Sequence, residues 1–334
     1  MQEWLLGTWY GASQRGWWLL PLGWLFAGLS TLRRWAYRRG VFRSYRSPRP
    51  VVIVGNLSVG GTGKTPLVIW LAGELAKRRL RIGIASRGYG GRGGQAKLVG
   101  DSDDAASVGD EAVLLHRRLR LPVAIAANRA EAVRLLEPMS DVILADDGLQ
   151  HYALQRDLEI AVVDGERGLG NGRLLPAGPL REPRARLDTV DAVVVNGAGF
   201  QWPGALRMNL VPVAVVALVS GERRAVAAFA GKRVHAIAAI GNPARFFSML
   251  REQGLRLDEL PLPDHAAIPR AALRHDDGQD ILMTEKDAVK CPDGGLPHAW
   301  YVEVDARIDS PQAGALLDRI VEMTQRNLGA RTGG

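Results

Sequence analysis

The sequence predicts an α/β fold, with a mostly parallel sheet flanked by helices, a second and smaller α/β lobe, and an N-terminal membrane-associated helix. Short apolar runs alternate with helix-like segments over residues 51–197, a pattern typical of parallel sheets covered by helices. A glycine-rich turn joins the first apolar run to the first helix-like segment. Six of the nine tryptophans lie within the first 35 residues, which indicates a membrane-facing element.

The overall composition is that of a globular protein with an anionic partner. The 334 residues are 47% hydrophobic and 23% charged, so the chain can bury sizeable cores, and its length predicts two domains. The formal net charge of +8 suits nucleic acid, a membrane surface or a phosphorylated substrate. The single cysteine, Cys291, excludes an internal disulfide framework.

Residues 1–35 are expected to form a membrane anchor helix. Residues 16–32 contain no ionisable side chain, and an acid-free stretch rich in arginine follows them. Arginines on the cytoplasmic side of a membrane bind anionic lipid. The apolar run is shorter than the roughly 20 residues that span a bilayer, and Pro21 interrupts it, so an anchor embedded in one leaflet is favoured over a full span. The alternative is an apolar helix packed on its own domain.

Residues 36–212 are expected to form the core domain. Six apolar runs have the length and composition of strands that are buried on both faces: 51–56, 81–86, 121–127, 141–146, 158–164 and 191–197. Amphipathic segments at 65–79 and 109–120 are expected to be helices. Ligands of such sheets bind at the carboxyl ends of the strands.

Residues 213–334 are expected to form the smaller lobe, which a hairpin over 213–229 would join to the core. A strand, turn and helix are predicted over 234–254, where Asn242 is the expected N-cap and Pro243 the first helical residue. Further segments complete the lobe: a strand and turn at 280–290, a strand at 299–308 and a final helix at 310–327.

The glycine-rich turn, "GNLSVGGTGKTP" at 55–66, predicts the phosphate-binding loop of a P-loop NTPase-like fold. Main-chain amides of such a turn point at one anion, and the following helix adds its positive end. Lys64 would reach the β and γ phosphates of a nucleotide, and the Thr65 hydroxyl would hold Mg²⁺. Serine replaces the usual first glycine, but three glycines remain. The predicted loop consists of Ser58, Val59, Gly60, Gly61, Thr62, Gly63, Lys64 and Thr65.

Two pairs of acidic residues are candidates for metal and hydroxyl chemistry. Asp146 and Asp147 end a predicted buried strand, where a Walker-B-type aspartate belongs, although a solvated turn would look similar. Asp110 and Glu111 open a predicted helix. From the pattern alone these two acids compensate the helix dipole, but a kinase also needs a carboxylate to orient or deprotonate the attacking hydroxyl.

Two loops rich in glycine and arginine, 86–94 and 168–186, could clamp phosphates. Solvent-facing loops of no chemical role are the alternative. The candidate arginines are Arg87, Arg92, Arg173, Arg181 and Arg184. His265 follows Asp264 in another loop, so an acid could pair with this histidine.

The motifs together closely resemble the tetraacyldisaccharide 4′-kinases, the lipid A 4′-kinases of Gram-negative bacteria. They occur in the order "GNLSVGGTGKTP", "SRGYGG", "GDEAVLLHRR", "DDGLQH", "LLPAGPLREP", "IGNPARFF", "LPDH" and "TEKDAVK". The resemblance implies transfer of the ATP γ-phosphate, with Mg²⁺, to the 4′-hydroxyl of a tetraacylated glucosamine disaccharide 1-phosphate, giving lipid IVA. It also implies attachment to the anionic cytoplasmic face of the inner membrane.

The resemblance assigns roles to particular residues. It implies that Asp110 acts on the acceptor hydroxyl and that His265 is its partner from the second lobe, which replaces the dipole interpretation. Lys64 would complete the catalytic set. Metal and phosphates would fall to Thr65, Glu111, Asp146 and Asp147. Residues expected near the substrate are Gln150, His151, Arg87, Arg173 and Arg181.

Two other classes of protein remain as alternatives. A P-loop GTPase or metal-centre chaperone would usually carry an Asn-Lys-x-Asp motif for guanine, but "TEKD" has the wrong order and "VVVNGAG" lacks the lysine. A nucleic-acid ATPase would use the positive charge on DNA or RNA, with arginines along a groove and not after an apolar anchor. We therefore expect no nucleic-acid partner.

Overall fold

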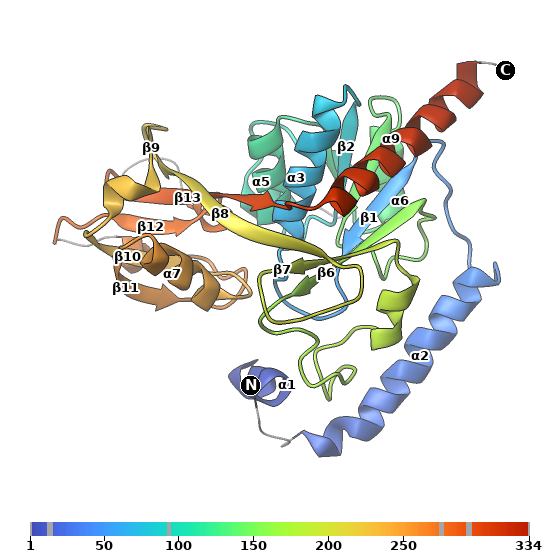
Figure 1. Ribbon diagram of the computed structural model, residues 1–334, viewed down its shortest axis with the longest axis horizontal. Coiled ribbons are helices and arrows are strands. Elements are labelled where there is room, and N and C mark those ends of the chain that lie inside the picture. The colour runs from blue at the N-terminus through green and yellow to red at the C-terminus, as the bar shows by residue number, and fades with distance from the viewer. Residues whose placement is uncertain (1, 12–15, 92–94, 274–276, 292–295, 333–334) are drawn as a thin grey trace.

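One sheet runs through both lobes of the molecule (Figure 1). The computed structural model describes residues 2–11, 16–91, 95–273, 277–291 and 296–332. Within these residues the strand order is β11-β10-β12-β13-β8-β7-β6-β1-β5-β2-β4-β3, and β9 pairs with β8. The fold is therefore α/β with a mostly parallel sheet, as predicted.

The core half of the sheet confirms the six predicted strands. They are mutually parallel, and the short β3 (Lys97–Leu98) pairs antiparallel with β4 at the edge. Their bounds are β1 (Val51–Gly55), β2 (Ile82–Ser86), β4 (Val123–Ile125), β5 (Val142–Asp146), β6 (Leu158–Asp164) and β7 (Ala192–Asn196). The carboxyl ends of β1 and β5 lie together, because Val54 pairs with Asp146.

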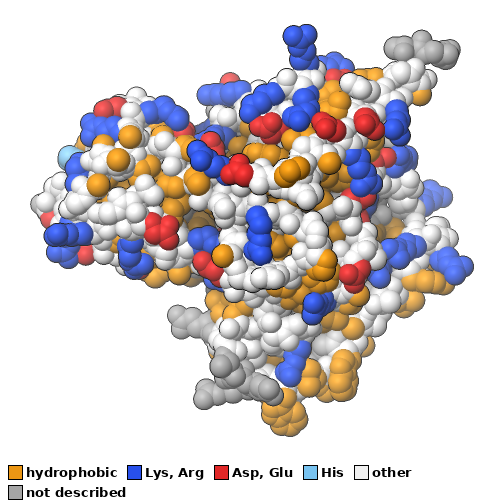
Figure 2. Space-filling view, viewed as in Figure 1, with side chains coloured by type: hydrophobic (Ala, Val, Ile, Leu, Met, Phe, Trp, Pro, Cys, Tyr) orange, Lys and Arg blue, Asp and Glu red, His pale blue; other side chains and the backbone are white. Residues whose placement is uncertain are grey.

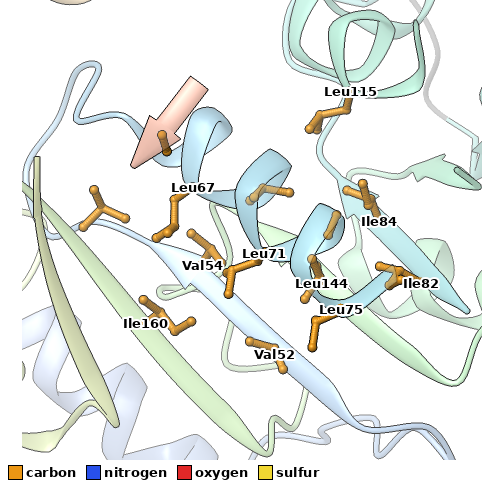
Figure 3. Packing of buried hydrophobic residues seen from close by; sticks show 14 of the residues in the cluster. Val52, Val54, Leu67, Leu71, Leu75, Ile82, Ile84, Leu115, Leu144 and Ile160 are labelled. Carbon is orange, nitrogen blue, oxygen red and sulfur yellow. The ribbon is translucent and has the colours of Figure 1, made fainter. Parts of the chain in front are cut away.

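Helices cover both faces of this half. On one face lie α3 (Lys64–Lys77), α5 (Asp110–Leu119) and the four-residue α4 (Ala105–Val108), and on the other lies α6 (Arg129–Leu136). Every fourth residue of α3 is apolar, so Leu67, Leu71 and Leu75 form one fully buried stripe against the strands (Figure 3). This packing fixes the start of α3, and with it the predicted phosphate loop.

The smaller lobe contains a parallel arrangement of three strands. Asn242 caps α7 through a bond from the Arg245 amide, and Pro243 opens the helix, as predicted. The elements are β10 (Arg233–Ala238), α7 (Pro243–Glu252), β11 (Arg256–Pro261), β12 (Ile281–Thr284) and α8 (Glu285–Ala288). Short 3-10 helices lie at Val226–Phe229 and Arg270–Leu273 of this lobe, and a third lies at Arg184–Thr189 in the core.

The lobes are joined by an antiparallel ribbon of β8 (Leu206–Ala217) and β13 (Ala299–Arg307). β8 pairs with β7 in the core sheet and continues into the smaller sheet. The expected hairpin is present only as the contact of β8 with the two-residue β9 (Arg223–Arg224). The true connection therefore depends on a partner strand far along the chain, which a local pattern does not reveal.

The final helix, α9 (Pro311–Thr332), differs from the expectation that residues 213–334 form one lobe. Its buried residues Ala313, Leu316, Leu317 and Ile320 belong to the hydrophobic core that α3 shares. The chain thus returns along β13 to the core, and its last helix covers α3 there. The division into an anchor (1–35), a core (36–212) and a smaller lobe otherwise stays a prediction.

The N-terminal helices α1 (Gln2–Tyr10) and α2 (Leu20–Arg38) lie at the edge of the molecule, with a short 3-10 turn (Trp17–Leu19) before α2. Pro21 does not interrupt α2, because it occupies the first turn, where no amide hydrogen is needed. Trp24 is 70% exposed, and Leu25, Leu29 and Leu32 are each 59% exposed. Figure 2 shows hydrophobic side chains along the edge where α2 lies. Gly23 and Ala36 of α2 are buried, so the helix packs on the domain along one side and exposes large apolar side chains on the other. Its attachment to a membrane stays a prediction.

No described helix combines the length and the hydropathy that crossing a membrane requires.

Candidate active site

The predicted phosphate loop lies between β1 and α3. Gly60 and Gly63 have φ values of 97° and 95°, which glycine adopts without strain. Asn56 organises the loop from β1, because its side-chain amide donates to the carbonyls of Ser58 (2.8 Å) and Gly60 (3.2 Å). Its Oδ1 accepts from the Lys64 ammonium at 3.3 Å. Ser58 is buried, and its main chain bridges Leu180, so serine fits the position where glycine is usual.

A cavity of about 520 Å³ lies between the lobes, beside this loop. Lys64, Thr65 and Glu111 line it from the core, and Lys286 and Arg245 line it from the smaller lobe. The two lobes are in close backbone contact at Gly61 and Gly241, where a Cβ on Gly241 would collide with the main chain of Gly61. Apolar side chains that could cover a planar base also line the cavity: Leu210, Phe246, Met249, Val302 and Val304.

Asp146 has the properties of a ligand for a cation. It ends β5 and is 1% exposed, and neither of its carboxylate oxygens has a hydrogen-bond partner among the described residues. Burial, and next the charge of Glu111, raise its pKa to about 7. A bound cation would remove the cost of burying this unpaired carboxylate.

Two of the other predicted metal ligands, Asp147 and Glu111, form ion pairs with protein cations, whereas Thr65 lines the cavity. Asp147 forms ion pairs with Arg181 at 3.0 Å and Lys64 at 3.6 Å. Burial raises the pKa of Asp147, but these two cations outweigh it and hold the pKa well below its usual range. Glu111 pairs with Lys286 at 3.0 Å. The described residues include no group of three acidic, His or Cys side chains that could hold a metal. Mg²⁺ commonly needs only one or two carboxylates, because water and substrate phosphates complete its shell.

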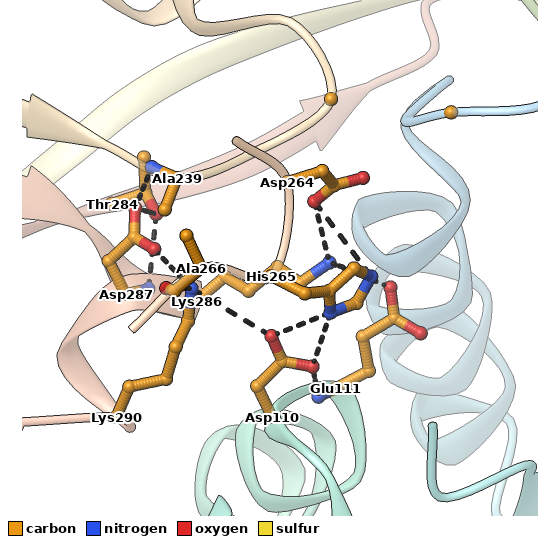
Figure 4. A network of polar contacts seen from close by, with 12 residues as sticks. Asp110, Glu111, Ala239, Asp264, His265, Ala266, Thr284, Lys286, Asp287 and Lys290 are labelled. Carbon is orange, nitrogen blue, oxygen red and sulfur yellow. Dashed lines mark hydrogen bonds and ion pairs between the residues drawn. The ribbon is translucent and has the colours of Figure 1, made fainter. Parts of the chain in front are cut away.

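Asp110 and His265 meet although 155 residues separate them (Figure 4). His265 Nδ1 lies 3.0 Å and 3.2 Å from the two carboxylate oxygens of Asp110. Burial raises the pKa of Asp110, but the bond from His265 and the charge of Lys286 together bring it below its usual value. The Asp110 bond in turn raises the pKa of His265. The pair therefore comes from α5 of the core and a loop of the smaller lobe.

Backbone and ring contacts hold this pair in place. His265 has a φ of 62°, which is unusual for a residue with a Cβ, and its amide donates to the carbonyl of Ala239 at 3.2 Å. The ring of Tyr89, from the predicted "SRGYGG" loop, lies 4.9 Å from the imidazole. The structure thus brings the "SRGYGG", "GDE" and "PDH" segments together.

Gln150 and His151 lie near the loop but already have protein partners. The Gln150 amide donates to the carbonyl of Asn56 at 3.2 Å and to Glu182 at 3.1 Å. His151 Nε2 accepts from the Arg129 amide at 3.2 Å, which leaves Nδ1 to carry the proton. Burial, and next the charges of Arg129 and Arg156, lower the pKa of His151 to about 4.

The candidate arginines differ in environment. Arg181 pairs with Asp147 and donates hydrogen bonds to both oxygens of Asn56, so it stabilises the phosphate loop. Arg87 is exposed and Arg173 half-buried, and neither forms an ion pair with another described residue. Arg184 lies over the ring of Trp202 at 5.2 Å, and Arg92 lies outside the described residues.

Sequence reasoning missed three residues of the site. Asn56 gave no signal beyond its position before the loop. Lys286 and Lys290 belong to the quoted "TEKDAVK" segment, but no role was drawn from it. Lys290 donates to Asp287 at 2.6 Å and lies 3.9 Å from Asp110.

The site defines a P-loop phosphotransferase. It combines a strand, a glycine loop and a helix that begins with Lys-Thr, and beside them lie a buried aspartate and a second carboxylate that is paired with histidine.

Comparisons with known proteins narrow this class. The family model described as "Tetraacyldisaccharide-1-P 4'-kinase" matches residues 15–322. A tetraacyldisaccharide 4′-kinase of Pasteurella multocida is 46% identical over 94% of this chain and 98% of its own length. One from Pseudomonas paraeruginosa is also 46% identical, over 96% and 97%. The crystal structure of an "apo" form of LpxK from Aquifex aeolicus, in complex with ATP, superposes with a TM-score of 0.76 at 28% identity, covering 90% of this chain and 98% of that one.

The chain belongs to the tetraacyldisaccharide 4′-kinase family, and it is a lipid kinase of lipid A biosynthesis. The resemblance drawn from the motifs is confirmed, and the GTPase or metal-centre chaperone alternative is not favoured.

We predict that His151 stays neutral down to about pH 4, as an NMR titration of its ring would show. The unfolded chain protonates this group near its ordinary pKa of 6.5 and so binds more protons between those two values. Stability should therefore fall as the pH falls through that window, and it should fall less steeply in His151→Gln. Titration of the wild-type ring near pH 6.5 would contradict the assignment.

Proposed function

We propose that this chain transfers the γ-phosphoryl group of ATP to the 4′-hydroxyl of a tetraacylated glucosamine disaccharide 1-phosphate, with Asp110 as general base. The supporting observation is the contact of Asp110 with His265, 3.0 Å apart, next to the cavity that the phosphate loop lines. The acceptor oxygen attacks the γ-phosphorus, the bond from that phosphorus to the β,γ-bridging oxygen breaks, and the hydroxyl proton passes to Asp110. His265 donates through Nδ1 to the carboxylate and orients it.

The low pKa of Asp110 is compatible with this role. Burial opposes ionisation, but His265 and Lys286 keep the carboxylate charged at neutral pH and able to accept a hydrogen bond from the alcohol. Phosphoryl transfer passes through a loose transition state in most analyses, so the proton need not leave early. The base then mainly orients the nucleophile, and the lobes exclude water that would otherwise hydrolyse ATP.

The loop 58–65 would hold the nucleotide phosphates through main-chain amides and Lys64. Asp146, with Thr65 and the substrate phosphates, would hold Mg²⁺, which supplies neutralisation of the charge on the β and γ oxygens. Asp147 pairs with Lys64 and Arg181 in this arrangement, and Glu111 lines the cavity together with Lys64. The remaining candidates for binding the acceptor headgroup are Arg87, Arg173, Gln150 and His151. Arg87 and Arg173 form no ion pair with another described residue, so their charges are available to the phosphate of the acceptor.

We place this reaction at the cytoplasmic, anionic face of the inner membrane. The acyl chains of the acceptor remain in a bilayer, and the apolar face of α2 is exposed beside the arginines that follow it. Hydrogen bonds tie α1 to the site, since Trp9 Nε1 donates to the carbonyl of Pro176 at 3.0 Å and Tyr10 donates to that of Val59 at 3.4 Å. An anchor in the headgroup plane would therefore hold the phosphate loop at a set height.

We expect Asp110→Asn to lower kcat about 10²- to 10⁴-fold, the range typical of a lost general base, with little change in ATP affinity. The measurement is phosphate gain by the lipid disaccharide 1-phosphate in detergent with Mg-ATP, beside calorimetric ATP binding. Lys64→Ala is the matched comparison, because it should lose phosphoryl transfer and nucleotide affinity together. Loss of ATP binding by Asp110→Asn in proportion to its activity would argue against the base.

We expect Leu25→Glu to weaken binding to vesicles that contain anionic phospholipid by about tenfold or more, since a charge would enter the apolar face. Val219→Glu is the control, because Val219 is also 59% exposed but lies in the turn after β8. Binding is measured by vesicle co-sedimentation. Equal effects of the two substitutions would remove α2 from the proposal.

A further inference from the structure

Lys286 occupies the centre of the boundary between the lobes (Figure 4). Its side chain is 16% exposed, and its ammonium lies 3.0 Å from Glu111 Oε1, 3.3 Å from His265 Nε2 and 3.6 Å from Asp264 Oδ1. One cation thus contacts the core helix that carries Asp110 and, at the same time, the imidazole that bonds Asp110.

Hydrogen bonds hold α8, the short helix that carries Lys286, in place. Thr284 caps α8 by accepting from the Asp287 amide at 3.2 Å. Asp287 is fully buried and accepts from the Ala239 amide at 2.9 Å and from Lys290 at 2.6 Å. Ala239 also bonds the amide of His265 through its carbonyl, so the lysine and the histidine share one support.

The ammonium restricts where the imidazole proton resides. A lysine ammonium only donates, so the nitrogen that faces it, Nε2, must present its lone pair. The other nitrogen, Nδ1, faces the carboxylate of Asp110, which only accepts when ionised. Both neighbours therefore favour the same form of neutral His265, with the proton on Nδ1.

Asp264 would favour the opposite form if Lys286 were absent. Its Oδ1 lies 3.8 Å from His265 Nε2, and that buried oxygen has no hydrogen-bond partner among the described residues. Without the ammonium beside both groups, this carboxylate would attract the proton to Nε2, and Nδ1 would then present a lone pair to Asp110 and donate no hydrogen bond.

We propose that Lys286 is a positioning residue, whose ammonium holds His265 in the Nδ1–H tautomer and directs that donor at Asp110 across the lobe boundary. This inference rests on the proposed role of the Asp110–His265 pair. Lys286 acts through His265, and its bond to Glu111 makes the arrangement complete only when the lobes are together.

The tautomer of His265 is read from long-range ¹H–¹⁵N spectra of ¹⁵N-histidine-labelled full-length protein, assigned by its loss in His265→Gln. Wild-type protein at a pH where the ring is neutral should show the Nδ1–H form. Lys286→Met should move the signal toward Nε2–H and lower kcat about tenfold or more, with the KM values for ATP and lipid changed less than threefold. Lys286→Arg should restore the Nδ1–H form and most of kcat.

Arg118→Met is the control for a merely structural bridge between the lobes. Arg118, on α5, lies 3.3 Å from Glu285 of α8, and it pairs with acids of the smaller lobe without contacting His265. It should leave the tautomer unchanged. If the wild-type protein shows the Nε2–H signal, the proposal is wrong. It is also wrong if the tautomer of His265 in Lys286→Met is the same as in the wild-type protein. An equal tautomer shift in Arg118→Met would assign the effect to lobe closure. Full activity in Asp110→Asn would instead refute the proposed function, whatever the tautomer.

Discussion

The bond between Asp110 and His265 crosses the boundary between two lobes, and the rest of the site is arranged around it. The two lobes share one sheet, because β8 belongs to both and pairs with β13 along the ribbon between them. Main-chain contact of Gly61 with Gly241 closes the boundary beside the phosphate loop, and Lys286 links Glu111 to His265. The cavity beside the loop therefore has walls from both lobes, and a nucleotide bound by the loop would lie in it.

The buried charges of the site fall into two groups. Asp147 pairs with Lys64 and Arg181, and these three side chains together keep one positive charge beside the phosphate loop. Asp146 has no such partner, and burial with the nearby charge of Glu111 raises its pKa. Of the acids at the strand ends, Asp146 is therefore the one whose burial is relieved most by a bound cation.

Local patterns in the sequence were enough for the core. The six buried strands, the loop from β1 to α3 and the N-cap at Asn242 depend on neighbours within a few residues, so they were predictable. The β8–β13 ribbon and the packing of α9 on α3 depend on residues far apart, and they were not. The site residues divide in the same way, into those that a local pattern predicts and those that depend on distant contacts. Lys64 was predictable from its loop, whereas Asp110 by pattern alone only compensates a helix dipole, and the contacts of Asn56 and Lys286 appear only in three dimensions.

The two N-terminal helices contact the region around the phosphate loop. Tyr10 of α1 reaches the carbonyl of Val59, in the phosphate loop. The ring of Tyr37, in α2, lies 6.2 Å from that of Tyr152, whose hydroxyl bonds Glu182, and Glu182 also accepts from Gln150. Side-chain contacts thus connect α2 to the region of the loop, while its large apolar side chains stay exposed.

The most direct test of this account is a double-mutant cycle on kcat with Asp110→Asn, His265→Gln and the double variant, all at saturating Mg-ATP and lipid. If His265 acts only through Asp110, the double variant should be about as slow as Asp110→Asn alone. If the two rate losses multiply, the residues act independently, and the pairing across the lobes is not the basis of catalysis.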